Sequence, residues 1–109
     1  VKFSYEENLD GTISITGGSW EGIAELLIPS VYEGKTVSRV AYCSFYGRND
    51  IASVTIDVPF VDSGAFHVDD SLRAVRLTSM VVSVGDWAFA CDGSLTYLDI
   101  GEGVEGFGA

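Results

Sequence analysis

The chain has 109 residues, 47% of them apolar, and 16 acidic against 6 basic side chains, for a formal net charge of −10. This length supports one core of ordinary size, and the apolar content is too high for a disordered acidic tail. The charge disfavours nucleic acid and anionic membrane surfaces as partners. The longest apolar run, residues 87–91, is far below the roughly 18 residues of a membrane helix, so no membrane insertion is expected.

Residues 1–36 lack the repeat that governs the rest of the chain and are predicted to form an N-terminal cap. Asp10-Gly11 lies between the extended segments 3–5 and 12–16 and supplies the positive φ of a tight turn, so a β-hairpin is expected. The residues expected to cover the first repeat unit, whose apolar layer would otherwise face water, are Trp20, Leu26, Leu27 and Ile28-Pro29.

Residues 37–109 repeat with a period of 21 to 23 residues. Phe45, Phe66 and Phe89 lie 21 and 23 residues apart, and each follows a small residue. Valines stand eight and five positions before each Phe, and aliphatic residues stand six, nine and eleven positions after it. Such a period is typical of stacked units that bury their apolar side chains only against one another. The sequence therefore predicts about three coils and, from Val104 and Phe107, the start of a fourth.

Each unit contains two predicted extended segments. Residues 52–56, 73–77 and 96–100 alternate apolar and polar, which is typical of a short strand with one buried face. The residues before each Phe, such as 81–84, form a second short strand, and a compact turn or short helix carries the Phe into the core. The predicted fold is a repeat solenoid, mainly β with short turns or helices. An immunoglobulin-like sandwich also suits the length, but it gives no reason for the spacing.

The third unit, which reads VGDWAFAC over residues 84–91 and continues through Leu95 and Ile100, resembles the BspA-type leucine-rich repeat. The earlier units depart from that pattern at Ala41 and Asp62, where the family has Gly, and at Ser44, where it has Ala. The resemblance implies a curved right-handed solenoid on exported or cell-surface proteins of bacteria and some protozoa. In this family the repeats bind proteins and have no known chemistry of their own.

The sequence stops at Ala109, inside the turn that should lead to the next Ala-Phe pair. We therefore expect an N-terminal piece of a longer protein, truncated within the fourth coil. The alternative is a short natural chain whose open end docks on another copy. An uncapped last coil also predicts end-to-end self-association through that coil.

Three patterns associated with chemistry do not support an enzyme. Residues 101–106 spell G-x-G-x-x-G, but no helical pattern follows and two glutamates would repel a phosphate. Cys43 and His67 would need to meet for nucleophilic catalysis, and their repeat positions predict opposite sides of a core Phe in adjacent coils. Cys43 and Cys91 are two coils apart, about 10 Å, beyond the roughly 7 Å limit of a disulfide, so two free and largely buried thiols are expected. No catalytic residue, cofactor or metal is predicted.

Acidic residues gather in the loops that follow each Phe: Asp50, Asp69, Asp70 and Asp92. Stacked loops would bring these carboxylates together, and oxygen-rich clusters can hold calcium. Asp is also an ordinary turn residue, and no calcium-binding pattern is present. We therefore expect a solvated acidic ridge.

The outward positions of the predicted strands form the candidate protein-binding surface, which consists of Ser53, Thr55, Arg76, Tyr97 and Asp99. Regular solenoid sheets are rigid and extended, and Tyr and Arg are enriched at binding hot spots. Arg76 and Asp99 are in register and are predicted to pair laterally. Phe60 points outward from the other strand and is a second candidate contact.

Together these features predict a non-catalytic, adhesion-type protein-binding module of an exported or cell-surface bacterial protein, with a host or bacterial surface protein as its ligand. A secreted or surface location follows from the resemblance. Two alternatives remain open from the sequence: a structural spacer, and a non-catalytic appendage of a cell-wall-modifying enzyme.

Overall fold

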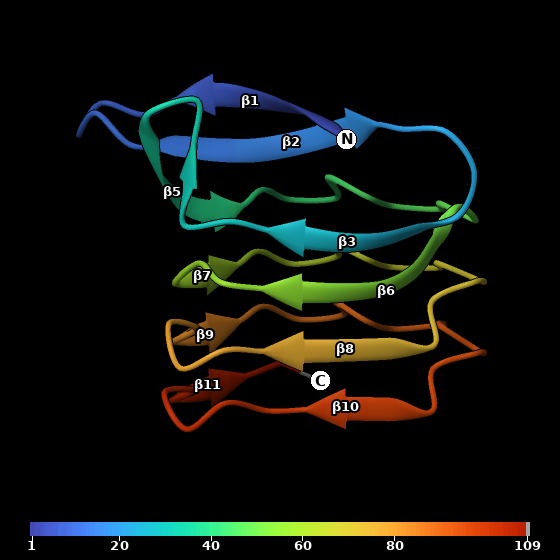
Figure 1. Cartoon of the computed structure of the whole chain (residues 1–109). Coiled ribbons are helices and arrows are strands. Elements are labelled where there is room, and N and C mark those ends of the chain that lie inside the picture. The colour runs from blue at the N-terminus through green and yellow to red at the C-terminus, as the bar shows by residue number, and fades with distance from the viewer. Residues whose placement is uncertain (109) are drawn as a thin grey trace.

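Figure 1 shows the computed structural model of the chain, which describes residues 1–108; Ala109, the last residue of the predicted repeat region, lies outside them. Eleven strands follow one another in the described part, and it contains no helix. Their bounds are β1 Lys2–Glu7, β2 Ile13–Ser19, β3 Ala24–Ile28, β4 Val31–Tyr32, β5 Lys35–Val40, β6 Ile51–Ile56, β7 Phe60–Val61, β8 Ala74–Leu77, β9 Ser83–Val84, β10 Tyr97–Asp99 and β11 Gly106–Phe107.

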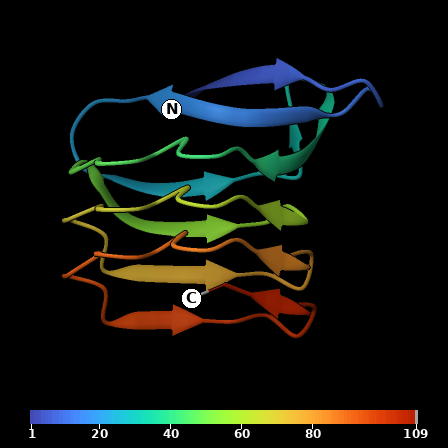
Figure 2. The same cartoon turned by 180° about the vertical axis from the view of Figure 1, so that it is seen from behind.

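The strands form a β-solenoid of about four turns with two sheets, in which the strands of successive coils pair parallel. One sheet, here called the front sheet, has the order β10-β8-β6-β3, and the other, the rear sheet, runs β1-β2-β5-β7-β9-β11 with β4 beside β5. Figures 1 and 2 show each coil passing from a front strand, round a loop, to a rear strand and back. The predicted repeat solenoid and its strands are therefore confirmed. Of the two alternatives for the segment that carries each Phe, a compact turn or a short helix, the structure has the turn.

The pairing registers reproduce the 21- and 23-residue spacings of the sequence. Ser53 pairs with Ala74 and Ala74 with Tyr97 in the front sheet, and Phe60 pairs with Ser83 in the rear sheet. The coil that begins at β6 is shorter than the one that begins at β8, because the loop between β6 and β7 covers residues 57–59, whereas that between β8 and β9 covers residues 78–82. The two extra residues are thus confined to the loop on one side of the coil.

The expected N-terminal hairpin is present, but regular stacking begins before residue 37. β1 and β2 pair antiparallel around the Asp10-Gly11 turn. β2 also pairs parallel with β5, and β3 pairs parallel with β6, so both strands belong to the solenoid sheets. Of the residues expected to cover the first unit, Leu26 is buried in β3, whereas Leu27 is 57% exposed because successive side chains of a strand alternate in direction.

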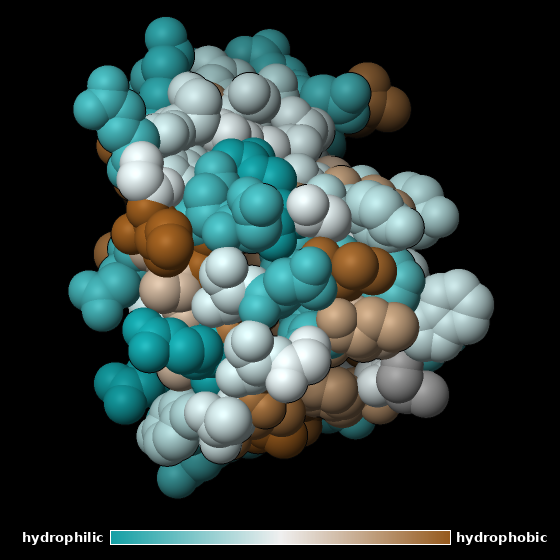
Figure 3. All heavy atoms as spheres, turned by 90° about the vertical axis from the view of Figure 1, so that its right-hand side faces the viewer, coloured by the Kyte–Doolittle hydropathy of each residue, from teal (hydrophilic) through white to brown (hydrophobic). Residues whose placement is uncertain are grey.

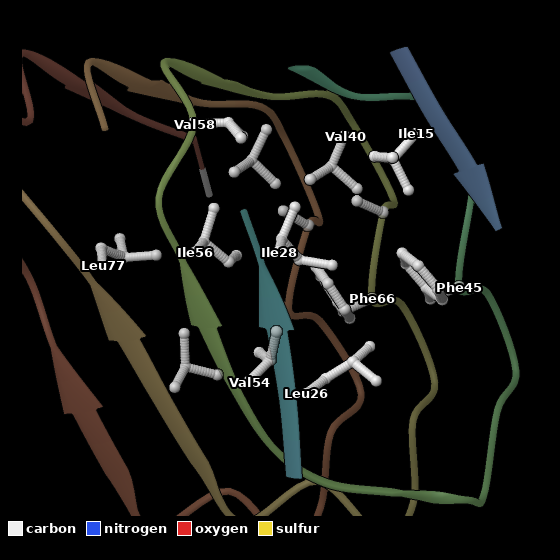
Figure 4. Packing of buried hydrophobic residues seen from close by; sticks show 14 of the residues in the cluster. Ile15, Leu26, Ile28, Val40, Phe45, Val54, Ile56, Val58, Phe66 and Leu77 are labelled. Atoms are coloured by element: carbon white, nitrogen blue, oxygen red, sulfur yellow. The ribbon is translucent and has the colours of Figure 1, made fainter. Parts of the chain in front are cut away.

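The repeated phenylalanines form a stack through the core. The ring centroids of Phe45 and Phe66 are 5.1 Å apart and those of Phe66 and Phe89 are 5.5 Å apart, with nearly parallel planes. Figure 4 shows Phe45 and Phe66 facing the aliphatic side chains of the front strands across the coil. In the last coil Leu98 and Ile100 occupy the aliphatic positions but are exposed, because no further strand lies beside β10 within residues 1–108.

The Phe turns, residues 42–47, 63–68 and 86–91, have an unusual backbone that recurs in all three coils. The second and the sixth residue of every Phe turn have positive φ. They are Cys43, Gly64 and Trp87 at the second place and Gly47, Val68 and Cys91 at the sixth, with φ between 53° and 69°. Only glycine adopts this left-handed region without cost, so four of the six positions carry a strained residue. Hydrogen bonds to the next coil hold the turns, for example from Phe66 N–H to the Ala88 carbonyl at 2.7 Å.

Candidate functional site

The outward side chains of β6, β8 and β10, which we call the sheet face, include all five residues of the predicted binding surface. Ser53, Thr55, Arg76 and Tyr97 surround a shallow hollow of about 160 Å³. The rows are continuous across the sheet: Thr55 pairs with Arg76, and Arg76 with Asp99. The structure thus brings these residues together, as their repeat positions predicted.

The predicted lateral pair on the sheet face is present. Arg76 Nε lies 3.4 Å from Asp99 Oδ2, and the two side chains are 61% and 45% exposed. An ion pair this exposed contributes about 0–1 kcal/mol to stability, because water screens it and two flexible side chains must be ordered. Leu27, in register with Thr55, extends the same face with an exposed apolar side chain.

A second surface lies on the Phe turns, which Figure 2 shows as the kinked segments that follow the rear strands. The outward side chains of three successive turns enclose a hollow of about 560 Å³, here called the aromatic hollow. It is lined by Tyr42, Tyr46, Ser63, His67, Asp86 and Trp87, together with Cys43 and Gly64. The sequence reasoning missed this site, because only Tyr46 and His67 share a repeat position, whereas Tyr42 and Trp87 stand at two others.

The rings of the aromatic hollow remain open to solvent although they touch one another. The His67 ring lies 5.3 Å from the Tyr46 ring and 6.3 Å from the Trp87 ring, measured between centroids. Tyr42, Tyr46 and Trp87 are 72%, 54% and 64% exposed. His67 Nδ1 is 3.0 Å from the Ala90 carbonyl oxygen, which only accepts, so Nδ1 carries a proton and Nε2 of the neutral ring is an acceptor.

The expectation that Cys43 and His67 lie on opposite sides of a core Phe is wrong. Both line the aromatic hollow. The left-handed backbone at Cys43, with φ 53°, turns this part of the chain in a way that the repeat spacing does not reveal.

Both cysteines are free, as predicted, but they are not buried in the core. Cys43 is half-buried and Cys91 is exposed. Each occupies a left-handed position of its Phe turn, and neither of these positions holds one of the buried apolar side chains of the solenoid. The prediction that Cys91 fills the core is therefore wrong.

Two of the four acidic loop residues are buried, so the expected solvated ridge is wrong for them. Asp69 is fully buried, and its Oδ1 accepts the Arg48 backbone N–H at 2.8 Å. Asp92 is 8% exposed, and its Oδ1 accepts the Asp69 backbone N–H at 2.7 Å. In successive coils, each of these side chains thus accepts a backbone N–H of the preceding coil in place of a backbone carbonyl. Asp70 is exposed, and Asp50 is bound at both oxygens by the Arg48 guanidinium.

Burial changes the acidity of both carboxyls. It raises the pKa of Asp69 from 3.8 to about 8, against the opposing effect of the hydrogen bond from Arg48 N–H, and the neighbouring Asp92 carboxylate raises it further. Burial also raises the pKa of Asp92, to about 6. The second oxygen of each carboxyl has no hydrogen-bond partner in the structure.

Neither a metal site nor a nucleotide site is built from the candidate residues. Within residues 1–108, no group of three or more His, Cys, Asp or Glu side chains is arranged to hold a metal ion. In the G-x-G-x-x-G segment, Gly101 and Gly103 lie so close to the backbone of the loop at Thr78 and Ser79 that a Cβ on either would collide with a carbonyl oxygen. These glycines therefore serve the packing of one coil on the next.

The loops that follow the Phe turns form the edge of the solenoid seen in Figure 3, where hydrophilic and hydrophobic side chains are interspersed. At the start of this edge the Arg48 guanidinium lies 4.3 Å from the centre of the Trp20 ring. Trp20 Nε1 in turn donates to the Asp50 carbonyl at 3.0 Å. No helix in the described residues is long and apolar enough to cross a membrane.

The stacked coils, with their Phe and aliphatic positions in register, define a leucine-rich repeat solenoid. Three solved structures show the same fold. The leucine-rich repeat protein of T. pallidum superimposes with a TM-score of 0.87 and 26% identity, over 97% of this chain and 50% of that chain. A leucine-rich cell-surface protein of Faecalibacterium prausnitzii gives a TM-score of 0.81 and 27% identity, over 97% of this chain and 31% of that chain.

A leucine-rich repeat protein of Bacteroides ovatus matches in fold alone, with a TM-score of 0.54 and 18% identity over all of this chain and 40% of that chain. The chain thus spans half or less of the length of each of these proteins. No family model and no curated protein matches the sequence. The chain therefore has the leucine-rich repeat fold of these bacterial proteins, and its repeat is consistent with the BspA type.

Proposed function

We propose that this chain is a non-catalytic, adhesion-type protein-binding module of an exported or cell-surface bacterial protein, and that the sheet face is its contact surface. The observation that carries the proposal is the in-register array of outward side chains on four parallel strands. Backbone hydrogen bonds to neighbouring strands make such a surface rigid, so little conformational entropy is lost when a partner binds. A surface location is supported by the similarity to a cell-surface protein of F. prausnitzii.

The side chains of the sheet face suit recognition better than chemistry. Leu27 and Tyr97 are 57% and 51% exposed and present apolar area, while Arg76 provides a planar cation beside them. Tyr and Arg are the types enriched at hot spots. The single histidine and both cysteines lie off this face, in the Phe turns. Ser53 and Thr55 therefore have no histidine or cysteine next to them on the sheet.

The experiment is a binding screen of the purified chain against extracellular-matrix and bacterial surface proteins, read by surface plasmon resonance. For a partner held by the sheet face, the Arg76→Ala, Tyr97→Ala double variant should bind at least about tenfold more weakly. An Arg73→Ala, Met80→Ala double variant is the matched control, because both residues are exposed and lie off the face. Equal binding by all three proteins would remove the sheet face from the proposal. No binding to any protein would favour a spacer.

A further inference from the structure

The aromatic hollow combines exposed rings with acceptor groups. Its open rings belong to Tyr42, Tyr46 and Trp87, and its acceptors are the Asp86 carboxylate, the Ser63 hydroxyl and Nε2 of His67. The ion pairs of residues 1–108 are Arg39–Asp62, Arg48–Asp50 and Arg76–Asp99, so Asp86 has no basic partner in the described part. No Lys or Arg lines the hollow.

Elsewhere in the same molecule, three aromatic rings have one of the chain's own cations over them. Arg48 lies 4.3 Å from the centre of the Trp20 ring, Arg39 5.2 Å from that of Phe60, and Lys35 5.5 Å from that of Tyr5. These are the cation–ring contacts of the described residues, and none involves the hollow. A chain with 16 acidic and 6 basic side chains has few further cations to offer.

We propose that the aromatic hollow binds an arginine side chain presented by a basic segment of a protein partner. A guanidinium stacks on an indole or phenol ring through its face and donates hydrogen bonds from its edge, so it can use the rings and the acceptors at once. The net charge of −10 attracts a basic segment. The hollow of about 560 Å³ holds one such side chain together with its neighbours in the segment. This inference rests on the proposed protein-binding role and places a second contact on the Phe turns, away from the sheet face.

The repeat itself provides variants that preserve the fold. Trp87 occupies a left-handed position at which the preceding coil has Gly64, so Trp87→Gly removes the indole and relieves the backbone. Asp86 is equivalent to Ser63, so Asp86→Ser removes the carboxylate and keeps a residue that the turn already uses. Met80→Ala, on an exposed loop outside the hollow, is the control.

The test is titration of the ¹⁵N-labelled chain with the capped peptide Gly-Ser-Arg-Gly-Ser-Gly, its citrulline and lysine analogues, and N-acetyl-arginine amide. The Trp87 indole N–H should shift on addition of the arginine peptide, while the Trp20 indole, covered by Arg48, should not. Citrulline keeps the shape of arginine without its charge and should bind about tenfold more weakly or worse. Trp87→Gly and Asp86→Ser should each weaken binding about three- to tenfold, and higher salt should weaken it as well.

Equal binding of the arginine and citrulline peptides would overturn the proposal, and so would undiminished binding by both hollow variants. Stronger binding of N-acetyl-arginine amide than of the peptide would indicate that the hollow binds a free small molecule, and it would overturn the proposal of a protein segment as the ligand. The Arg76→Ala, Tyr97→Ala variant separates this inference from the proposed function. If the sheet-face variant loses its protein partner but still binds the arginine peptide, the two sites are independent.

Discussion

Asp69→Asn tests whether the buried Asp69 carboxyl, which accepts a hydrogen bond from the preceding coil, is neutral in the folded protein. The Asn side-chain oxygen can still accept the Arg48 N–H, while the amide nitrogen replaces an Oδ2 that has no hydrogen-bond partner. The substitution therefore keeps the shape and the accepted hydrogen bond and removes the titration. Its buried amide N–H groups add a cost of about 1–3 kcal/mol that is the same at every pH, so the slope with pH is the diagnostic quantity. Asp70→Asn is the matched control, because Asp70 is the exposed neighbour and its loss changes the charge of the unfolded chain by the same amount.

The sign follows from the raised pKa of Asp69, about 8 in the folded protein against 3.8 ordinarily. The folded state keeps its proton over a range in which the unfolded state has lost it, so stability is complete below about pH 4 and falls as pH rises towards 8. Each pH unit in that range corresponds to about 1.4 kcal/mol. Between pH 5 and pH 8 the wild type should lose about 4 kcal/mol through Asp69, and Asp92, with a pKa of about 6, adds to the loss at the acidic end.

The assay is urea unfolding followed by circular dichroism at half-unit steps from pH 5 to pH 8. Asp69→Asn should flatten the dependence of the free energy of unfolding on pH, and at pH 8 it should be more stable than the wild type by up to about 4 kcal/mol. Asp70→Asn should keep the wild-type slope. A wild type as stable at pH 8 as at pH 5, or a variant with an unchanged slope, would refute the assignment of a neutral buried carboxyl.

Two further predictions concern the Phe turns. Phe66→Ala should destabilise the chain by about 3–5 kcal/mol in urea unfolding, because it opens a cavity between two stacked rings. The control Phe60→Ala, on an exposed rear strand, should cost under about 1 kcal/mol. Similar losses for the two variants would contradict the stacked core. At position 68, where φ is 60°, the Val68→Gly variant should be more stable than the Val68→Ala variant by about 1 kcal/mol, the reverse of the usual order. Calorimetric melting of the two variants checks this. A more stable Ala variant would disprove the backbone strain.

The fold could be predicted from the sequence because one signal is repeated three times. A single apolar position is ambiguous in a chain that is 47% apolar, but the Phe positions and their flanking aliphatic residues recur in phase. The observed pairings, such as Ser53 with Ala74, follow the same spacing. The sheet-face residues were placed together for the same reason, since alternation in a strand determines which side chains face outward.

The buried aspartates and the aromatic hollow escaped prediction for two different reasons. Asp69 and Asp92 occupy the same repeat position, 23 residues apart, whereas the exposed Asp70 does not. The repeat position therefore distinguishes the buried aspartates from the exposed one, but the residue type alone does not. The hollow depends on left-handed turns at residues such as Trp87 and Cys43. Glycine normally marks such turns, so aromatic and thiol side chains there gave no signal.

The loop between the front and the rear strands has a practical consequence. Two residues enter the coil between β8 and β9, while β8 keeps its pairing with β6 and β9 keeps its pairing with β7. The loop on this side of the molecule can therefore differ in length between coils without changing the pairing register of either sheet. Met80 is exposed and lies just beyond the backbone of Thr78 and Ser79 that packs against the next coil, so it is the position in this loop for grafting a peptide epitope or an affinity tag.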